Sequence, residues 1–415
     1  MSPATMVRAA DTLRRQTFSA LANPNYRLWF GGQSISLAGT WMQMIAQSWL
    51  VLELTGSGTE IGLVVALQTL PTLLLGPYAG VVADRLDKRR LMIILQATMG
   101  LLALALGLLT ITGLVALWQV YLLALLLGTT NCFENPARQA FVLEMVGPGD
   151  LRNAVSLNSV LVNVARAAGP AIAGLVIAAG GIGVCFLVNA ASFVAVVASL
   201  IRMDVSMLSR SVPMPRAPGQ LREGLSYVWR TPALGIPLAM MTLVGCLAYE
   251  FQVVLPIVAS ETFDGDARAY GFLTAAMGAG AVVGGLWVAA WGQTGLRALV
   301  GASAAFGVAM AAAALAPDMI VALLAMGLVG VTSVAFLSMS NSTLQLAAEP
   351  HMRGRVMALW AVAFLGSTPI GGPIAGAVSE HFGGRAGLAL GAVACLVAAA
   401  MGVLVLRRAA LPSPG

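Results

Sequence analysis

The densest group of residues that could form ion pairs lies in residues 80–90, GVVADRLDKRR. Six of these eleven positions are charged, although charged residues make up only 10% of the chain. Uncharged stretches flank the segment at 61–79 and 91–117, which places it at the edge of a membrane. There Asp84 can accept hydrogen bonds from helix N-termini and from arginines of a neighbouring helix. Such contacts can form and break as a gate.

The basic residues of this segment also allow a simpler interpretation, because lysine and arginine fix the orientation of membrane helices. We expect that anchoring role for Lys88 and Arg90. Gly76 and Gly80 form a G-x-x-x-G pair before the charges, and such pairs let two helices approach closely.

Two ionisable residues, Arg166 and Glu250, lie inside long apolar stretches, where such groups are rare and usually functional. Arg166 lies about thirteen residues into its stretch, about 20 Å deep and near the midplane. It could bind an anionic group of a substrate, influence a nearby acid, or pair with a neighbouring carboxylate. Glu250 is the first candidate for carrying a coupled proton. The alternative is that its helix bends outward and the side chain meets external water.

Uncharged polar and aromatic residues in the same stretches suit a large amphipathic ligand. The further substrate or coupling candidates are Trp41, Gln43, Gln47, Asn163, Gln252 and Asn341. Glu134 is expected to pair with Arg138, one helical turn further on, or to reach Arg85 or Arg89.

Enzymatic motifs are missing from the sequence: it holds no phosphate-binding loop, no G-x-S-x-G and no H-E-x-x-H. The four cysteines are widely spaced and the two histidines are isolated, so no metal site is expected. We therefore expect neither an enzyme nor a cofactor. Energy has to come from an ion gradient, first of all a proton gradient, or from a substrate moving down its own gradient.

These residues need a frame of membrane helices, and the composition predicts one. The chain is 59% hydrophobic with a mean hydropathy of +0.87, and a crossing helix needs about 20 apolar residues. Helices are favoured because lipid cannot satisfy open backbone groups and the alternation of a membrane barrel is absent. A very large soluble helical core is the alternative. The predicted spans are 28–52, 60–81, 91–112, 116–136, 153–178, 183–202, 234–258, 269–291, 297–316, 318–341, 355–378 and 386–406.

The basic residues predict the orientation of these spans. All lysines and arginines except Arg166, Arg268 and Arg385 fall on one side, which is therefore predicted to be cytoplasmic and to hold both termini. The net charge of +6 then requires no nucleic-acid partner.

The predicted organisation is a cytoplasmic segment (1–27), a six-helix bundle (28–202), a cytoplasmic linker (203–233), a second six-helix bundle (234–406) and a tail (407–415). Pro213, Pro215 and Pro218 predict an extended linker, and the following QLREGLSYVWR predicts an amphipathic helix on the membrane surface.

The two halves repeat short motifs at offsets of 204 and 203 residues. The repeated pairs are Gly76 and Gly80 with Gly280 and Gly284, and Gly169-Pro170 with Gly372-Pro373. We expect the glycine-proline pairs to bend the fifth and eleventh spans. Duplicated six-helix halves are typical of transporters that rock about a substrate site near the midplane.

The spacing Gly80-x-x-x-Asp84-Arg85-x-x-Lys88-Arg89 resembles the G-x-x-x-D-R-x-x-R-R motif of the major facilitator superfamily. The resemblance implies a gating role for Asp84, Arg85 and Arg89. The segments NPNYRLWFGGQ, SWLVLELTGS, NPARQAFV and NAVSLNS resemble the drug and siderophore exporter branch, so that the likeness covers about residues 20–406. Glu134 stands where that branch usually has an aspartate.

The resulting expectation is an all-α membrane protein of the major facilitator fold, with twelve transmembrane helices in two pseudo-symmetric six-helix bundles. It would act as a monomer in the plasma membrane and exchange protons for an amphipathic drug, siderophore or secondary metabolite. The alternatives are an importer or facilitator of the same fold and, from another class, a non-transporting sensor or a lipid scramblase.

Overall fold

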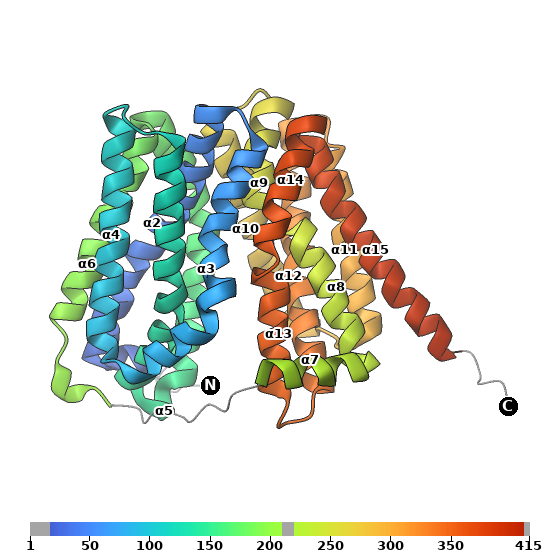
Figure 1. The fold of residues 1–415 in the computed structure, drawn as a ribbon, viewed down its shortest axis with the longest axis horizontal. Coiled ribbons are helices and arrows are strands. Elements are labelled where there is room, and N and C mark those ends of the chain that lie inside the picture. Colours follow the sequence, from blue (N-terminus) through green and yellow to red (C-terminus); the bar gives the residue numbers. More distant parts are fainter. Residues whose placement is uncertain (1–16, 210–219, 411–415) are drawn as a thin grey trace, which may run out of the picture.

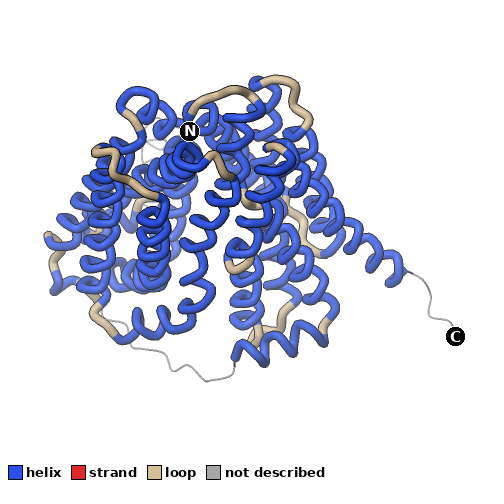
Figure 2. Tube along the Cα trace, turned by 45° about the horizontal axis from the view of Figure 1, so that its top comes forward, coloured by secondary structure: helices blue, strands red, loops and turns tan. Residues whose placement is uncertain are grey.

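The computed structural model describes residues 17–209 and 220–410, and the regular elements within these two ranges are helices (Figure 2). The predicted all-helical membrane fold is therefore confirmed. Pro213, Pro215 and Pro218 of the predicted linker lie outside the described residues.

Ten described helices or helix pairs are long and apolar enough to cross a membrane. Helix α2 (Pro24–Thr55) is long enough at 32 residues but is not among these ten, because it is less apolar. Helix α5 (Leu117–Gly180) is 64 residues long, which is enough for two crossings. Adding α2 to the ten and counting α5 as two crossings gives the twelve predicted spans.

The N-terminal bundle begins with a capped helix. The Asn23 side chain accepts hydrogen bonds from the backbone N–H groups of Asn25 and Tyr26, and Pro24 occupies the first helical position. Both features favour a helix start at this residue. After α2 the bundle continues with α3 (Gly58–Arg85), α4 (Lys88–Ile111), α5 and α6 (Ile182–Ile201).

The C-terminal bundle follows a short surface helix, α7 (Gln220–Arg230). Its elements are α8 (Pro232–Ala248), α9 (Phe251–Ile257), the π-helical turn η3 (Val258–Thr262), α10 (Ala267–Trp291), α11 (Leu296–Ala314), α12 (Met319–Ala347), α13 (Arg353–Leu365), α14 (Thr368–Phe382) and α15 (Gly384–Ala410).

The two bundles stand side by side, with α7 at the end of the molecule where α2 begins and α15 ends (Figure 1). We call this the linker end and the opposite one the far end. In α7, Val228 is buried against the C-terminal bundle, whereas Leu225 and Trp229 are 52% and 85% exposed. The helix therefore has one face on the protein and apolar side chains left for the membrane surface.

Helix α5 differs from the sequence prediction, which placed a loop between spans ending at 136 and starting at 153. Two helical runs meet here at a kink, where Gly147 is non-helical with φ 70° and ψ 174°. Gly147 adopts a positive φ without strain and Pro148 begins the next helical run, so the chain changes direction without a loop.

Two other spans are interrupted. Helix α8 ends at Ala248 and α9 starts at Phe251, and α13 is separated from α14 at residues 366–367. Gly169-Pro170 and Gly372-Pro373 both lie inside helices without a break, so the bends predicted there stay a prediction. A membrane helix can continue past a proline when neighbouring groups satisfy the freed carbonyl.

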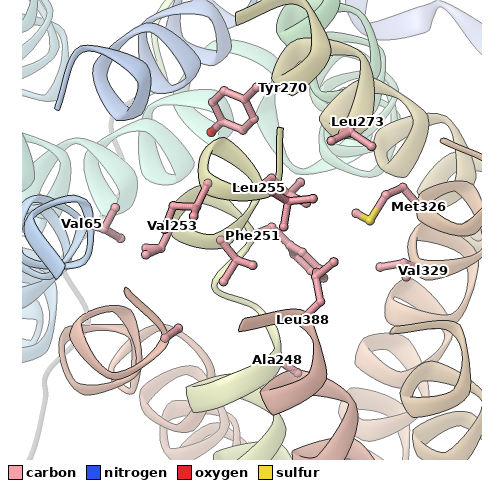
Figure 3. Packing of buried hydrophobic residues seen from close by; sticks show 14 of the residues in the cluster. Val65, Ala248, Phe251, Val253, Leu255, Tyr270, Leu273, Met326, Val329 and Leu388 are labelled. Carbon is pink, nitrogen blue, oxygen red and sulfur yellow. The ribbon is translucent and has the colours of Figure 1, made fainter. Parts of the chain in front are cut away.

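The buried apolar residues show where the bundles join. One large core contains residues of both bundles, and Figure 3 shows Val65 of α3 facing Val253 of α9 within it. Separate cores lie at the linker end: one around Trp29 and Phe141 in the N-terminal bundle, another around Leu344 and Val356 in the C-terminal bundle. The bundles thus share a core toward the far end and are packed independently at the linker end.

Candidate functional site

The bundles meet through glycines on two helix pairs. Where α3 crosses α14, a Cβ on Gly62 would overlap the Gly372 carbonyl, and a Cβ on Gly376 would overlap the Gly58 carbonyl. Where α5 crosses α10, a Cβ on Gly174 would lie 2.9 Å from the Ala267 oxygen. Only glycine permits backbones to approach this closely.

Contact is lost along the same helices toward the linker end. A Cβ on Gly76 would meet no atom within 4 Å, and the nearby Leu74 and Tyr78 are 60% and 69% exposed. The bundles diverge there (Figure 1). The predicted close approach at Gly76 is therefore wrong for this state, while Gly80 is buried in α3. In the second half, Gly280 and Gly284 do pack tightly on α12.

The far end is closed by a carboxylate of one bundle bound to a helix start of the other. Glu380 Oε2 accepts hydrogen bonds from Ser57 Oγ at 2.7 Å, from the Thr59 backbone N–H at 3.0 Å and from Thr59 Oγ1 at 2.5 Å. Ser57 is the N-cap of α3, so the negative charge also lies at the positive end of that helix.

Aromatic residues extend this closure inward. The rings of Trp49 and Tyr270, from α2 and α10, are stacked with centroids 6.5 Å apart. Trp49 Nε1 donates to Glu53 Oε1 at 2.7 Å and the ring is only 8% exposed. Trp49 is therefore part of the contact between bundles rather than an anchor in the membrane surface.

The charged segment at residues 84–90 is bound mainly within its own bundle. Lys88 Nζ pairs with Glu144 Oε1 at 2.9 Å, and both side chains are 7% exposed. Arg89 Nε donates to the Leu200 carbonyl at 2.8 Å and its terminal nitrogen to that of Ile201 at 2.9 Å. Arg89 thus caps α6, because lone carbonyls at a helix C-terminus accept such donors.

These contacts correct one prediction. Lys88, predicted only as a topology anchor, is buried in an ion pair. Arg89, predicted in the gate, binds a helix of its own half in this state, in which the bundles diverge at this end, so its gating role stays a prediction. Arg85 and Arg90 are exposed. Asp84 lies in the last turn of α3, and the placement of its side chain is outside the part of the protein that the structure describes.

Glu134 and Arg138 form the pair that their spacing predicts. Arg138 Nε lies 3.1 Å from Glu134 Oε1, and the amide of Gln96 on α4 donates to the same carboxylate at 3.3 Å. The extra methylene of Glu134 relative to aspartate therefore leaves the pairing intact, and neither Arg85 nor Arg89 is its partner in the described contacts.

Glu250 is the buried acid of the C-terminal bundle. It caps the start of α9 after the break, it is 4% exposed, and its Oε1 has no hydrogen-bond partner. A Cβ on Gly371 would lie 2.9 Å from this oxygen, and the Thr368 side chain is its polar neighbour on α14. The alternative in which Glu250 meets external water does not describe this state.

Arg166 is a partly buried cation inside the N-terminal bundle. Its guanidinium carbon lies 5.5 Å from the centre of the Trp41 ring, and its Nε is buried without a partner. None of the ion pairs in the described part of the chain includes Arg166. A structural pair with a neighbouring carboxylate is therefore not observed among the described residues. A Cβ on Gly278 of α10 would lie 2.8 Å from the Arg166 carbonyl oxygen, so the residue stands where the bundles meet.

The amide candidates have local partners. Gln43 accepts from the Asn189 amide at 2.6 Å and Gln47 from the Gln68 amide at 2.9 Å, and both are at least 94% buried within the N-terminal bundle. In this state they connect helices of one bundle, and their predicted part in a substrate site stays a prediction. The remaining candidates, Asn163, Gln252 and Asn341, are partly exposed.

Sequence reasoning missed Glu144, Glu380 and Tyr249. Glu144 lies in the region predicted as a loop, and Glu380 lies just past the predicted eleventh span, so neither was considered as a buried or bridging acid. Tyr249 donates to the Ser333 carbonyl at 2.6 Å and is an electrostatic neighbour of Arg166. A search for acids at span ends would have found Glu380.

Comparison with known proteins identifies the family. The family described as transmembrane secretion effector matches residues 15–413. The multidrug efflux pump Tap of Mycolicibacterium fortuitum is 28% identical over 83% of this chain and 87% of its own length. The enterobactin exporter EntS of Escherichia coli is 25% identical over 87% of this chain and 89% of its own.

Other matches are shorter or structural. The uncharacterised transporter YfiS of Bacillus subtilis is 29% identical, but the match spans only 49% of this chain and 48% of YfiS. The inward-facing, unoccupied structure of a bacterial homologue of the human lysosomal transporter Spinster has a TM-score of 0.72 at 14% identity, over 94% of this chain and 98% of that one. With a family match over almost the whole chain, this protein belongs to the transmembrane secretion effectors, a drug and siderophore exporter branch of the major facilitator superfamily, and is a membrane transporter rather than an enzyme.

Proposed function

We propose that this protein exports an amphipathic organic molecule from the cytoplasm across the plasma membrane in exchange for protons. The two bundles rock about a site between them and open it alternately to either side. Relatives named as a multidrug pump and an enterobactin exporter, each matched over more than four fifths of its length, support export.

The proposed orientation places the linker end in the cytoplasm. The concentration of lysine and arginine at that end supports this, because positive residues are retained on the cytoplasmic side. In this orientation the structure represents the state that loads substrate from inside the cell, with the outer side closed at Glu380.

Glu250 is the proposed carrier of the proton, and its burial next to the opposite bundle is the observation that carries the proposal. Its Oε1 is unpaired, and a buried carboxylate without a counter-ion is costly when charged. Its neighbours Gly371 and Gly372 pack where Gly62 of α3 approaches. Gain or loss of a proton at this position therefore changes the contact between the bundles.

The test uses everted membrane vesicles and a compound found by metabolite profiling of a deletion strain. If the protein is an antiporter, a proton gradient (acid inside the vesicle) will drive accumulation of that compound, and a protonophore will abolish it. Accumulation that ignores the gradient would contradict proton exchange and favour a facilitator of the same fold. Accumulation only in right-side-out vesicles would indicate an importer.

A further inference from the structure

We propose that Arg166 and Trp41 form the recognition site for an organic anion, so that the transported molecule carries a carboxylate or similar acidic group beside a flat apolar part. This rests on the proposed transport function and names the substrate class of the same site. The observation behind it is a cation at the meeting point of the two bundles for which the described part of the protein supplies no counter-ion.

The guanidinium is held but not neutralised. Trp41 covers one face of it at 5.5 Å, and a ring contact stabilises a cation without cancelling its charge. Gly169, one turn from Arg166 on α5, allows this contact, because a Cβ there would lie 2.6 Å from the Trp41 Cβ. Glycine at this position thus lets α2 and α5 approach until the ring lies against Arg166.

Glu250, the buried acid of the C-terminal bundle, faces a different helix from Arg166. Its carboxylate lies against Gly371 and Thr368 on α14. The titratable group near Arg166 is Tyr249, whose hydroxyl donates to the Ser333 carbonyl. Arginine offers five donors in a planar fork that matches a carboxylate. Its buried Nε has no hydrogen-bond partner among the described residues.

Position makes this a substrate site rather than a structural cation. Arg166 lies on the α5 face that packs on α10, one turn from Pro170 and two from Gly174, which touch the opposite bundle. One and two turns toward the linker end, the same face carries Asn163 and Ser159, whose side chains donate hydrogen bonds to carbonyls of their own helix. An anion entering from the linker end therefore meets polar groups first and the cation where the bundles close. A cationic molecule is repelled at the same place.

The test compares two probes of equal size, 2-naphthoate and 2-naphthamide, by equilibrium dialysis against the purified full-length protein in detergent. The wild type should bind the carboxylate about tenfold or more tightly than the amide, because hydrogen bonds to charged groups are the stronger ones. Arg166→Gln should abolish this preference, and Arg166→Lys should keep part of it, since the charge remains but the fork is lost. Trp41→Leu should weaken the binding of both probes to the same degree.

Arg268→Gln is the matched control, because Arg268 is exposed at the far end and already pairs with Asp266 at 2.7 Å. It should leave the preference unchanged. Equal binding of both probes by the wild type, no saturable binding of 2-naphthoate up to millimolar concentration, or a preference that survives in Arg166→Gln would overturn the inference. Arg166→Lys keeps the test decisive if the glutamine variant does not fold.

Failure of the anion site and failure of proton exchange are separable in these experiments. Probe binding is measured without a gradient, so Glu250→Gln should retain the preference for 2-naphthoate while losing gradient-driven transport. If the protein prefers the carboxylate but its transport does not respond to a proton gradient, the anion site is supported and the proton coupling is contradicted.

Discussion

Glu250 stands at the break between α8 and α9, and its carboxylate lies against Gly371 of α14. Broken helices near the midplane commonly carry the ion and substrate sites of transporters. Tyr249, at the same break, is near Arg166 of the opposite bundle.

Replacing Glu250 by glutamine should separate proton coupling from substrate movement. The amide keeps the size of the side chain but cannot exchange a proton, so Glu250→Gln should abolish accumulation driven by a proton gradient in everted vesicles. Exchange of labelled for unlabelled substrate should continue. Glu349→Gln, which changes an exposed acid at the linker end, is the control. Full gradient-driven transport by Glu250→Gln would remove Glu250 as the proton carrier.

The Lys88–Glu144 pair should contribute to stability rather than to gating. Lys88→Met removes the buried ion pair with Glu144, and breaking a buried pair costs about 3–5 kcal/mol. The double variant Lys88→Met with Glu144→Leu should recover much of that loss in thermal unfolding of the purified protein.

Arg268→Gln, which breaks an exposed pair, should cost less than about 1 kcal/mol and serves as the comparison. A Lys88→Met protein as stable as the wild type would show that the pair does not matter for stability.

At the scale of single residues, the sequence predicted side-chain pairs within one helix but missed side-chain pairs between helices. Glu134 with Arg138 follows from a spacing of four residues, and Arg166 and Glu250 stand out as ionisable groups in apolar stretches. The partners of Gln43 and Gln47, Asn189 and Gln68, depend on how α2 packs on α6 and α3. The spacing of residues in the sequence does not show these contacts, and the assignment of both glutamines to a substrate site stays a prediction.

At the scale of elements, the hydrophobic pattern predicted the existence of the spans but not their joints. The Gly-Pro-Gly sequence at 147–149 suggests a loop, but in the structure the chain turns at the single non-helical residue Gly147, where the two helical runs of α5 meet. In the span that holds Gly372-Pro373, the helix is interrupted at residues 366–367, which the sequence did not predict. Glycine and proline tolerate several local conformations, and the tertiary contacts decide among them.

Close packing of α3 on α14 gives a test at this scale. Gly62→Ala forces a methyl group into the Gly372 carbonyl, so it should cost about 1–3 kcal/mol in the far-end-closed state and reduce transport. Gly76→Ala is the matched control on the same helix, because nothing lies within 4 Å of the added methyl group. It should be neutral or stabilise the helix by about 0.5–1 kcal/mol. Equal effects of the two substitutions on thermal unfolding and transport would contradict the described packing.

At the scale of the whole molecule, the distribution of cores defines how it moves. One core spans both bundles toward the far end, and separate cores fill each bundle at the linker end. Each bundle can therefore tilt with its own linker-end core intact, while the shared core and the Glu380 contacts have to separate. The helix α7, with Trp229 exposed, is placed to stay on the membrane surface during this tilt.

Glu380 should hold the far end closed. Glu380→Gln removes the charge that three donors of α3 contact, and Thr59→Ala removes one of those donors, so each should favour opening. The carboxylate is exposed and water competes for it, so we expect a several-fold change rather than complete opening. Because both changes break the same contact, combining them should add less than their sum. Glu261→Gln, which removes a neighbouring far-end acid that repels Glu380, is the control and should not promote opening.

Reciprocal labelling of two single cysteines tests alternating access most directly. Ala267→Cys reports on the far end, where Ala267 is 3% exposed against the opposite bundle, and Ser159→Cys reports on the linker end of the same interface. Both are placed in a background without native cysteines and labelled with a membrane-impermeant maleimide from each side of the membrane. The account predicts that the wild type labels mainly at Ser159→Cys from the cytoplasm, and that Glu380→Gln raises labelling at Ala267→Cys from outside while lowering it at Ser159→Cys. Simultaneous access to both positions, or far-end access that rises with no loss at the linker end, would contradict it.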